Sequence, residues 1–202
     1  MNEWIRRRSC AITVGLAMVL SLTFADRVEA EGTEALFEAQ IPIAAGSGFV
    51  AAGTGLEVEP GTITFDVPAG STVRQALLYW SGSEITATSP ATTIFVDGAA
   101  VVGRPVSDPA YFFSCDCGPG ASGDHYYSTY RADVTDLVAP GSNELVVAST
   151  IGALRNGAGV IVIYDDGGPL TPVLISDGTD LAYSGFSGDR GETVARTFKL
   201  GG

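Results

Sequence analysis

The sequence is poor in the residues that most often carry catalysis or bind nucleic acid. Its 202 residues include one histidine, three cysteines, and 11 lysines and arginines against 23 aspartates and glutamates. A net charge of −12 repels phosphate backbones and anionic lipids, which argues against nucleic acid and membrane surfaces as partners. A serine or cysteine triad would need His125, and no Gly-x-Ser-x-Gly motif accompanies it. We therefore expect a protein that is not an enzyme.

The apolar part of the N-terminal segment is too short to predict a transmembrane helix. It has 16 uncharged residues, 10–25, against the roughly 20 needed to cross a bilayer. Three arginines precede it at positions 6–8, and the small-residue stretch Val28-Glu29-Ala30 follows it. This order is typical of a secretory signal peptide, with cleavage after Ala30 or, as the alternative, after Ala25. A retained N-terminal anchor is the rival interpretation. We expect a secreted or cell-surface protein with no membrane insertion once the signal is removed.

Removal of residues 1–30 takes four of the 11 basic and three of the 23 acidic residues, which leaves 172 residues with a net charge of −13. A chain of this length, residues 31–202, is predicted to form a single domain with its own core. The sequence ends just after a predicted strand, so we also expect it to be a piece of a longer surface protein. The acidic balance suits either a solvated surface or divalent cations.

No long stretch of the sequence has the 3.6-residue period of a helix. Short apolar runs bounded by Gly, Pro, Asp and Ser recur instead, which predicts an all-β fold. Strands at roughly ten-residue spacing favour a β-sandwich or jelly roll, and the absence of βαβ alternation argues against a nucleotide-binding parallel sheet. Asp97-Gly98 predicts a type I′ hairpin turn. The predicted strands are 61–67, 72–80, 92–96, 99–102, 126–134, 143–150, 159–164 (central, covered on both faces), 172–176 and 193–200.

Residues 103–124 differ from the rest because they combine prolines, glycines and aromatic residues. We predict a long loop here with at most a short edge strand, and long ordered loops are often functional. Aromatic residues gather around this loop and form the candidate binding surface, because exposed rings stack on sugars or fill partner pockets. Strand packing beneath the loop is the alternative. The aromatic residues of this candidate surface are Tyr111, Phe112, Phe113, Tyr126 and Tyr127.

Two cysteines, Cys115 and Cys117, remain after the signal is removed. Export permits a disulfide between them, and the small Cys-x-Cys ring predicts a strained, easily reduced bond. Free thiols and metal ligation are the alternatives. Together with Asp124 and His125 the two thiols offer ligands suited to zinc or copper, although the spacing matches no standard zinc motif. The simpler expectation for His125 is an exposed loop residue.

Calcium is the one cofactor that the acidic residues suggest. Asp165-Asp166-Gly167, Asp177-Gly178-Thr179-Asp180, and Asp189 with Glu192 offer hard oxygen ligands. No 12-residue calcium-loop pattern is present, and Asp-Gly pairs are also ordinary turn formers. No pair of carboxylates stands out as a glycosidase site.

The segment 130–147 combines turn signals in a recognisable order. Asp133 is predicted to cap a single helical turn, with Val134, Leu137 and Val138 directed into the sandwich. Gly141 then permits the chain to reverse direction, and the side-chain amide of Asn143 can form hydrogen bonds with the turn backbone. These are features of folding and not of a site.

The same segment resembles the Asp-Val-Thr … Gly-x-Asn-x-Leu element of galactose-binding-domain-like jelly rolls, which occur as sugar-binding modules in some glycoside hydrolases. The order of residues 76–82, Val96-Asp97-Gly98 and 157–164 is also similar to β-sandwich domains of unknown function in bacterial and archaeal surface proteins. The resemblance covers about residues 72–178 and implies a fold more than a function. We expect a non-catalytic binding or structural module with an extracellular glycan or protein partner. A carbohydrate-active accessory protein is the alternative, and a calcium-binding envelope protein is a third.

Overall fold

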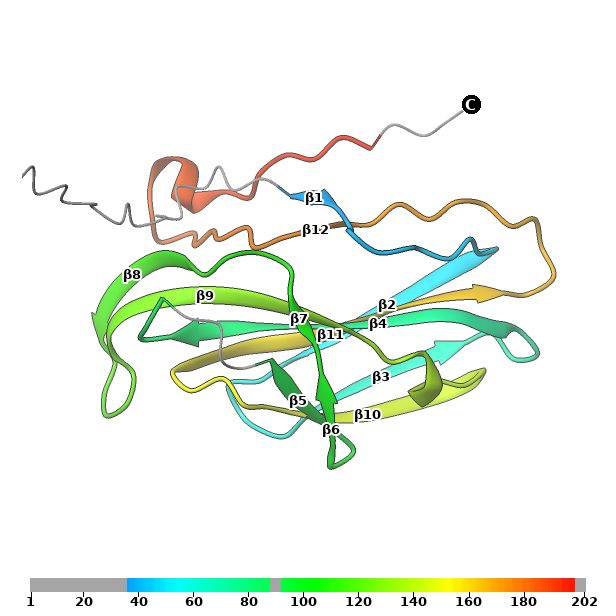
Figure 1. Ribbon diagram of the computed structural model, residues 1–202, viewed down its shortest axis with the longest axis horizontal. Coiled ribbons are helices and arrows are strands. Elements are labelled where there is room, and N and C mark those ends of the chain that lie inside the picture. Colours follow the sequence, from blue (N-terminus) through cyan, green and yellow to red (C-terminus); the bar gives the residue numbers. More distant parts are fainter. Residues whose placement is uncertain (1–35, 88–91, 199–202) are drawn as a thin grey trace, which may run out of the picture.

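The computed structural model describes residues 36–87 and 92–198, which form a β-sandwich (Figure 1). The predicted signal peptide lies outside the described residues. Within these ranges, no helix is long and apolar enough to cross a membrane. The strands and the two 3-10 turns, labelled η, are β1 Phe37–Glu38, β2 Gly48–Gly55, β3 Gly61–Val67, β4 Thr72–Glu84, β5 Thr93–Val96, β6 Ala99–Val102, β7 Arg104–Pro105, β8 Ala110–Asp116, β9 Ser122–Asp133, η1 Thr135–Leu137, β10 Gly141–Ser149, β11 Leu154–Asp165, β12 Ser176–Asp177 and η2 Gly188–Gly191.

Two antiparallel sheets form the sandwich, which confirms the all-β prediction. The larger sheet has six strands in the order β2-β11-β4-β9-β7, with β8 also paired to β9, and the smaller has the order β3-β10-β5-β6. In β3 the side chains alternate strictly between buried and exposed, as expected for a strand with one face in a core. In β11, Val160 faces the core and Ile163 the other side, yet both are buried. The predicted central strand covered on both faces is therefore confirmed.

The core lies between the sheets and is built from alternating residues of both. Trp80 on β4 and Tyr130 on β9 are direct cross-strand neighbours, and their rings stack with centroids 5.6 Å apart. Both are about 1% exposed. Full burial of a large apolar side chain contributes roughly 1.5–3 kcal/mol, so the core between the sheets supplies much of the stability of the domain.

The turn chemistry expected from the sequence is largely present. Asp97 and Gly98 have φ angles of 50° and 79°, which fits the predicted type I′ hairpin between β5 and β6. The Asp133 carboxylate accepts hydrogen bonds from the Thr135 N–H and hydroxyl at the start of η1. Asn143 binds the Ala139 backbone through both its amide nitrogen and its oxygen.

One part of that prediction is wrong. Val134 and Val138 point into the sandwich, but Leu137 is 45% exposed. The turn is a single 3-10 turn of three residues, and its tighter period rotates the third residue away from the core.

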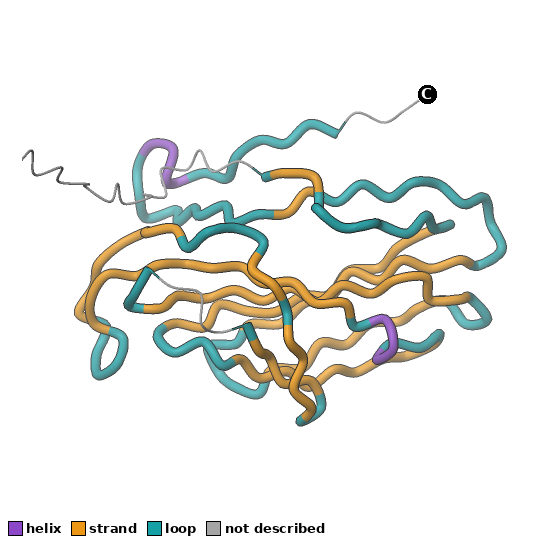
Figure 2. The backbone as a smooth tube through the Cα atoms, in the orientation of Figure 1, coloured by secondary structure: helices purple, strands orange, loops and turns teal. Residues whose placement is uncertain are grey.

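A third layer covers the outer face of the six-stranded sheet. The segment after β11, coloured orange to red in Figure 1, returns along this face together with β1, and β1 pairs with β12. Figure 2 shows that most of this layer is loop. The layer is anchored by Asp177, which pairs with Arg131 on β9 and accepts a hydrogen bond from the Tyr79 hydroxyl. Coverage by the outer layer also explains why Leu77, which faces away from the core, is only 1% exposed.

Several predicted strand boundaries are wrong. Residues 103–124 are not a long loop, because β7, β8 and the start of β9 lie within them. The irregular parts are the short connection 106–109 and the hairpin tip around Gly118 and Gly120. The predicted strand 172–176 is reduced to β12, since Pro172 has no N–H to donate to a ladder. In the described part of the predicted strand 193–200, residues 193–198 form no strand. Strand β2, rich in glycine and alanine, was not predicted.

Candidate functional site

A pocket of about 520 Å³ opens on the outer face of the six-stranded sheet, where the β8–β9 hairpin meets residues 180–186. The pocket has the size of typical small-ligand sites, which are about 300–1,000 Å³. Its walls are mostly aromatic or aliphatic. The lining residues are Phe112, Phe113, Tyr127, Asn156, Asp180, Leu181, Ala182, Tyr183 and Phe186.

A bulge in the hairpin explains why two adjacent phenylalanines line the same pocket. Neighbouring side chains of a regular strand face opposite sides, but the pairing of β8 with β9 shifts register between Tyr111 and Phe113. The Phe112 ring therefore meets both Tyr127 and Phe186 edge to face, at centroid distances of 5.8 and 5.4 Å. The bulge converts a two-sided strand into a one-sided aromatic wall.

The predicted aromatic surface is thus divided between two faces of the hairpin. Phe112, Phe113 and Tyr127 line the pocket. Tyr111 and Tyr126 are cross-strand partners outside it, and their rings meet edge to face with centroids 5.7 Å apart. The remaining pocket residues are Asn156 on β11 and five residues of the segment 180–186. Of these, only Asp180 was predicted to have a function, as a calcium ligand. No local pattern relates that segment to the hairpin, so its part in the site could not be found from the sequence.

Asp180 is the one carboxylate among the lining residues. Its Oδ2 accepts a hydrogen bond from the Val194 N–H at 2.8 Å. Its Oδ1 is buried and has no hydrogen-bond partner among the described residues. A buried acceptor without a partner costs roughly 1–3 kcal/mol, so this oxygen favours any bound group that donates a hydrogen bond.

A guanidinium closes one side of the aromatic cluster. The Arg190 group lies 4.5 Å from the Phe186 centroid and 5.3 Å from that of Phe112, and it donates a hydrogen bond to the Phe112 carbonyl. Such cation–π contacts contribute about 0.5–2 kcal/mol. Arg190 therefore joins the 180–190 segment to β8 and holds the pocket walls together.

A chain of polar groups runs from the pocket into the hairpin. Burial raises the pKa of the Tyr127 hydroxyl, and a hydrogen bond with Ser83 partly offsets the rise. Ser83 is fully buried, and its Oγ lies 2.7 Å from His125 Nδ1. The His125 ring stacks on Phe113 with centroids 4.9 Å apart. His125 is 0% exposed, so the expectation of an exposed loop histidine is wrong. It lies on β9 two residues from Tyr127, on the same face of the strand.

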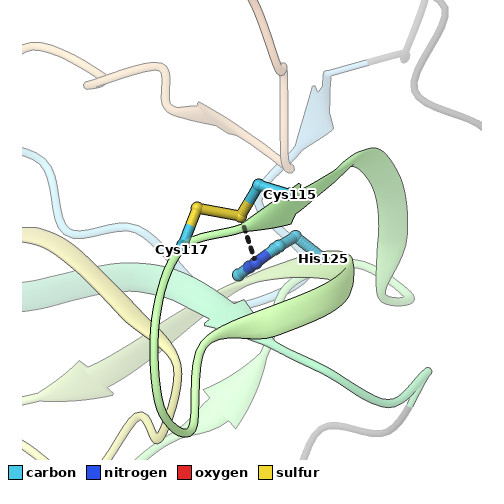
Figure 3. Close-up of side chains that lie close together, drawn as sticks. All are labelled: Cys115, Cys117 and His125. Atoms are coloured by element: carbon cyan, nitrogen blue, oxygen red, sulfur yellow. Dashed lines mark hydrogen bonds between the residues drawn. A yellow bond between two sulfur atoms is a disulfide. The ribbon is translucent and has the colours of Figure 1, made fainter.

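The far side of the His125 ring faces a disulfide. The structure joins Cys115 and Cys117, and His125 Nε2 lies 3.1 Å from Cys115 Sγ (Figure 3). The ligand atoms of these three residues all lie within 4.8 Å of one another. With the disulfide closed, neither sulfur is a thiolate, so the group can bind a metal only after reduction. Asp124, the fourth ligand considered from the sequence, accepts a hydrogen bond from Ser114 instead.

Three of the acidic residues considered for calcium, Asp165, Asp166 and Asp177, are engaged in local structure. Asp165 and Asp166 each accept a backbone N–H two residues ahead, as ordinary turn residues do. Hydrogen bonds with Ser47 and Gly168 lower the pKa of Asp166. Asp177 anchors the outer layer as described above. In the described ranges, the cysteine and histidine group is the one set of three His, Cys, Asp or Glu residues placed to share a metal ion.

Fold and site together define a two-sheet β-sandwich with an added outer layer and a ligand-sized aromatic pocket beneath that layer. A scan against family models matches residues 44–198 to the family described as a protein of unknown function, DUF3344, and the chain belongs to this family. The family match and the two-sheet fold confirm the predicted likeness to a β-sandwich domain of unknown function. No galactose-binding-domain relative is found. Comparisons with curated proteins and with solved structures gave no match.

Proposed function

We propose that this protein is an exported, non-catalytic binding module and that the aromatic pocket is its ligand site. The observation that carries the proposal is the buried Asp180 Oδ1, an acceptor without a partner in the described structure, among lining residues that are mostly aromatic or aliphatic. A few polar groups in an apolar concavity are the usual composition of a ligand pocket.

The chemistry of the walls favours a carbohydrate as the ligand. Aromatic rings stack on the C–H faces of sugars, and a carboxylate oxygen accepts hydrogen bonds from sugar hydroxyls. Phe113 and Tyr127 supply rings from the hairpin, and Phe186 supplies one from the segment 180–186. Glycoside hydrolysis uses two carboxylates, about 5–9.5 Å apart, and Asp180 is the one carboxylate of the lining. Binding without catalysis is therefore the function that this lining supports.

Glycan-array screening of the mature chain, followed by calorimetry on any hit, tests the proposal. Asp180→Asn keeps the shape but removes the charge, and we expect it to weaken binding about tenfold. Phe186→Ala should weaken binding as well. Asp136→Asn on η1 and Phe49→Ala on β2 are matched controls far from the pocket and should bind normally. Unchanged affinity in both pocket variants, or no selective glycan signal, would exclude this site as a glycan site.

Export is a separate part of the proposal with its own test. It rests on the N-terminal order of arginines, apolar run and small residues, and a disulfide within residues 115–117 is compatible with an oxidising compartment. N-terminal sequencing of the protein recovered from the culture medium should give a product that begins at Glu31. A product that begins at Met1 inside the cell would contradict export.

A further inference from the structure

The buried histidine beside the disulfide has no role in the proposed ligand site. Its ring lies between a hydroxyl and a sulfur, and it is 0% exposed. Burial of a titratable ring costs free energy unless its nitrogens are hydrogen-bonded. Here both nitrogens have partners, and one of those partners is a sulfur that can change its redox state.

The hydrogen bonds of His125 determine which nitrogen carries the proton. Nε2 lies 2.9 Å from the Ala121 carbonyl oxygen, which can only accept. Nε2 is therefore the protonated nitrogen of the neutral ring, and Nδ1 accepts a hydrogen bond from the Ser83 hydroxyl at 2.7 Å. The Nε2–H group faces both the Ala121 oxygen and Cys115 Sγ. Figure 3 shows the contact with Cys115.

This arrangement distinguishes the two sulfurs. An N–H donor directed at a sulfur stabilises a thiolate there more than a disulfide sulfur, because a hydrogen bond to a charged acceptor is stronger. Cys115 receives this contact and is half-buried, whereas Cys117 is exposed to solvent. The exposed sulfur of Cys117 is accessible to attack by a thiolate. The half-buried sulfur of Cys115 is the better leaving group, because the N–H contact stabilises it as a thiolate.

We propose that Cys115–Cys117 is a reactive disulfide that undergoes exchange with small thiols. The incoming thiolate attacks Cys117 Sγ, which forms a mixed disulfide and breaks the Cys115–Cys117 bond. Cys115 leaves with the electron pair as a thiolate that accepts the His125 Nε2–H hydrogen bond. A second thiolate then attacks the sulfur of the bound small thiol and frees Cys117. The protein disulfide gains two electrons and two protons, and two thiols become one disulfide.

Equilibration of the mature protein in buffers of reduced and oxidised dithiothreitol, followed by alkylation and mass spectrometry, measures the dithiol fraction. His125→Phe keeps a planar ring against Phe113 but removes the N–H donor. We expect it to disfavour the dithiol about tenfold relative to the native protein. Tyr126→Phe, on the opposite face of the hairpin, is the matched control and should leave the equilibrium unchanged. Equal dithiol fractions in His125→Phe and the native protein would overturn the proposal.

Two further measurements decide the question if His125→Phe does not fold. Brief treatment of the native protein with a monothiol should give a mixed disulfide on Cys117, and an adduct on Cys115 would contradict the proposed direction of attack. The single-cysteine variants compare the two sulfurs directly. By ultraviolet absorbance at neutral pH, Cys117→Ser, which retains Cys115, should show more thiolate than Cys115→Ser. The reverse order would show that His125 does not stabilise a thiolate at Cys115.

Discussion

The described part of the chain contains two apolar clusters that differ in size, in composition and in how far local sequence patterns predict them. The core between the sheets has 19 buried residues from the two sheets and adjoining turns, most of them aliphatic. The outer cluster has four buried residues, Ala110, Phe112, Tyr127 and Leu181, with Phe113 and Phe186 packed against them. The first is a closed interior, and the second borders an open pocket.

The two clusters also differ in how they treat polar groups. The outer region includes the buried pair Ser83 and His125 and the Asp180 oxygen without a partner in the described structure. Arg190 Nε is a further buried atom without a hydrogen-bond partner in the outer region, and the Tyr130 hydroxyl is the one such atom in the described core. Buried polar groups that cost stability are retained more readily where they serve binding or chemistry. We therefore expect the core to carry most of the stability, and we place the proposed ligand site in the outer cluster.

The same substitution, leucine to alanine, made once in each cluster tests most directly whether the two clusters differ in their contribution to stability. Leu78→Ala in the core should lower the free energy of unfolding by about 2–5 kcal/mol, because it leaves a cavity between tightly packed sheets. Leu181→Ala should cost about 1–2 kcal/mol, since its side chain already borders an open pocket. Urea denaturation of both variants measures the difference. Equal losses would mean that the outer layer is as essential to folding as the core.

A hairpin of the smaller sheet gives a prediction of intermediate size. Gly98→Val should cost about 1–2 kcal/mol, because a β-branched residue is forced to a φ of 79° although nothing crowds the position. Gly98→Asn is the matched control and should cost much less, since asparagine tolerates this region. Thermal melts of the two variants distinguish backbone strain from a steric clash. Equal stability of Gly98→Val and the native protein would contradict the type I′ turn.

The core was predictable because local patterns determine it. Asp97-Gly98 between β-branched arms specifies a hairpin, and the continuous apolar run 159–164 specifies a strand covered on both sides. Strand β2 escaped prediction because its glycines and alanines carry little hydrophobic signal. The hairpin of β8 and β9 was mistaken for a loop because the glycines and proline of its tip dominated the local composition.

The outer site was only partly predictable. Its aromatic residues were found from composition, but their division between two faces depends on a bulge between Tyr111 and Phe113 that no local pattern announces. The segment 180–186 reaches the hairpin through tertiary packing across some 70 residues of sequence. His125 was expected in solvent because it directly follows the predicted loop 103–124. It lies instead on β9, where Ser83, Phe113 and Cys115 contact its buried ring.

The smallest expected effect is a pH-dependent change in the free energy of unfolding that arises where the outer layer covers Tyr79. Burial by that layer raises the pKa of Tyr79 to about 12, with the Asp177 carboxylate adding to the rise and Arg131 opposing it. A raised phenol pKa means that the folded protein holds a proton that the unfolded chain releases near pH 10. The stabilising contribution is therefore complete below about pH 10 and is lost as the pH rises toward 12.

Tyr79→Phe isolates this contribution because it removes the titrating hydroxyl and keeps the ring. The native protein should lose stability more steeply than Tyr79→Phe between about pH 10 and 12, as measured by urea unfolding at a series of pH values. The difference is expected to be modest, because Tyr79 is only partly buried and solvent screens its neighbours. Parallel pH profiles would mean that the outer layer opens before the phenol ionises. The outer layer would then be a separate, weaker folding unit from the sandwich that it covers.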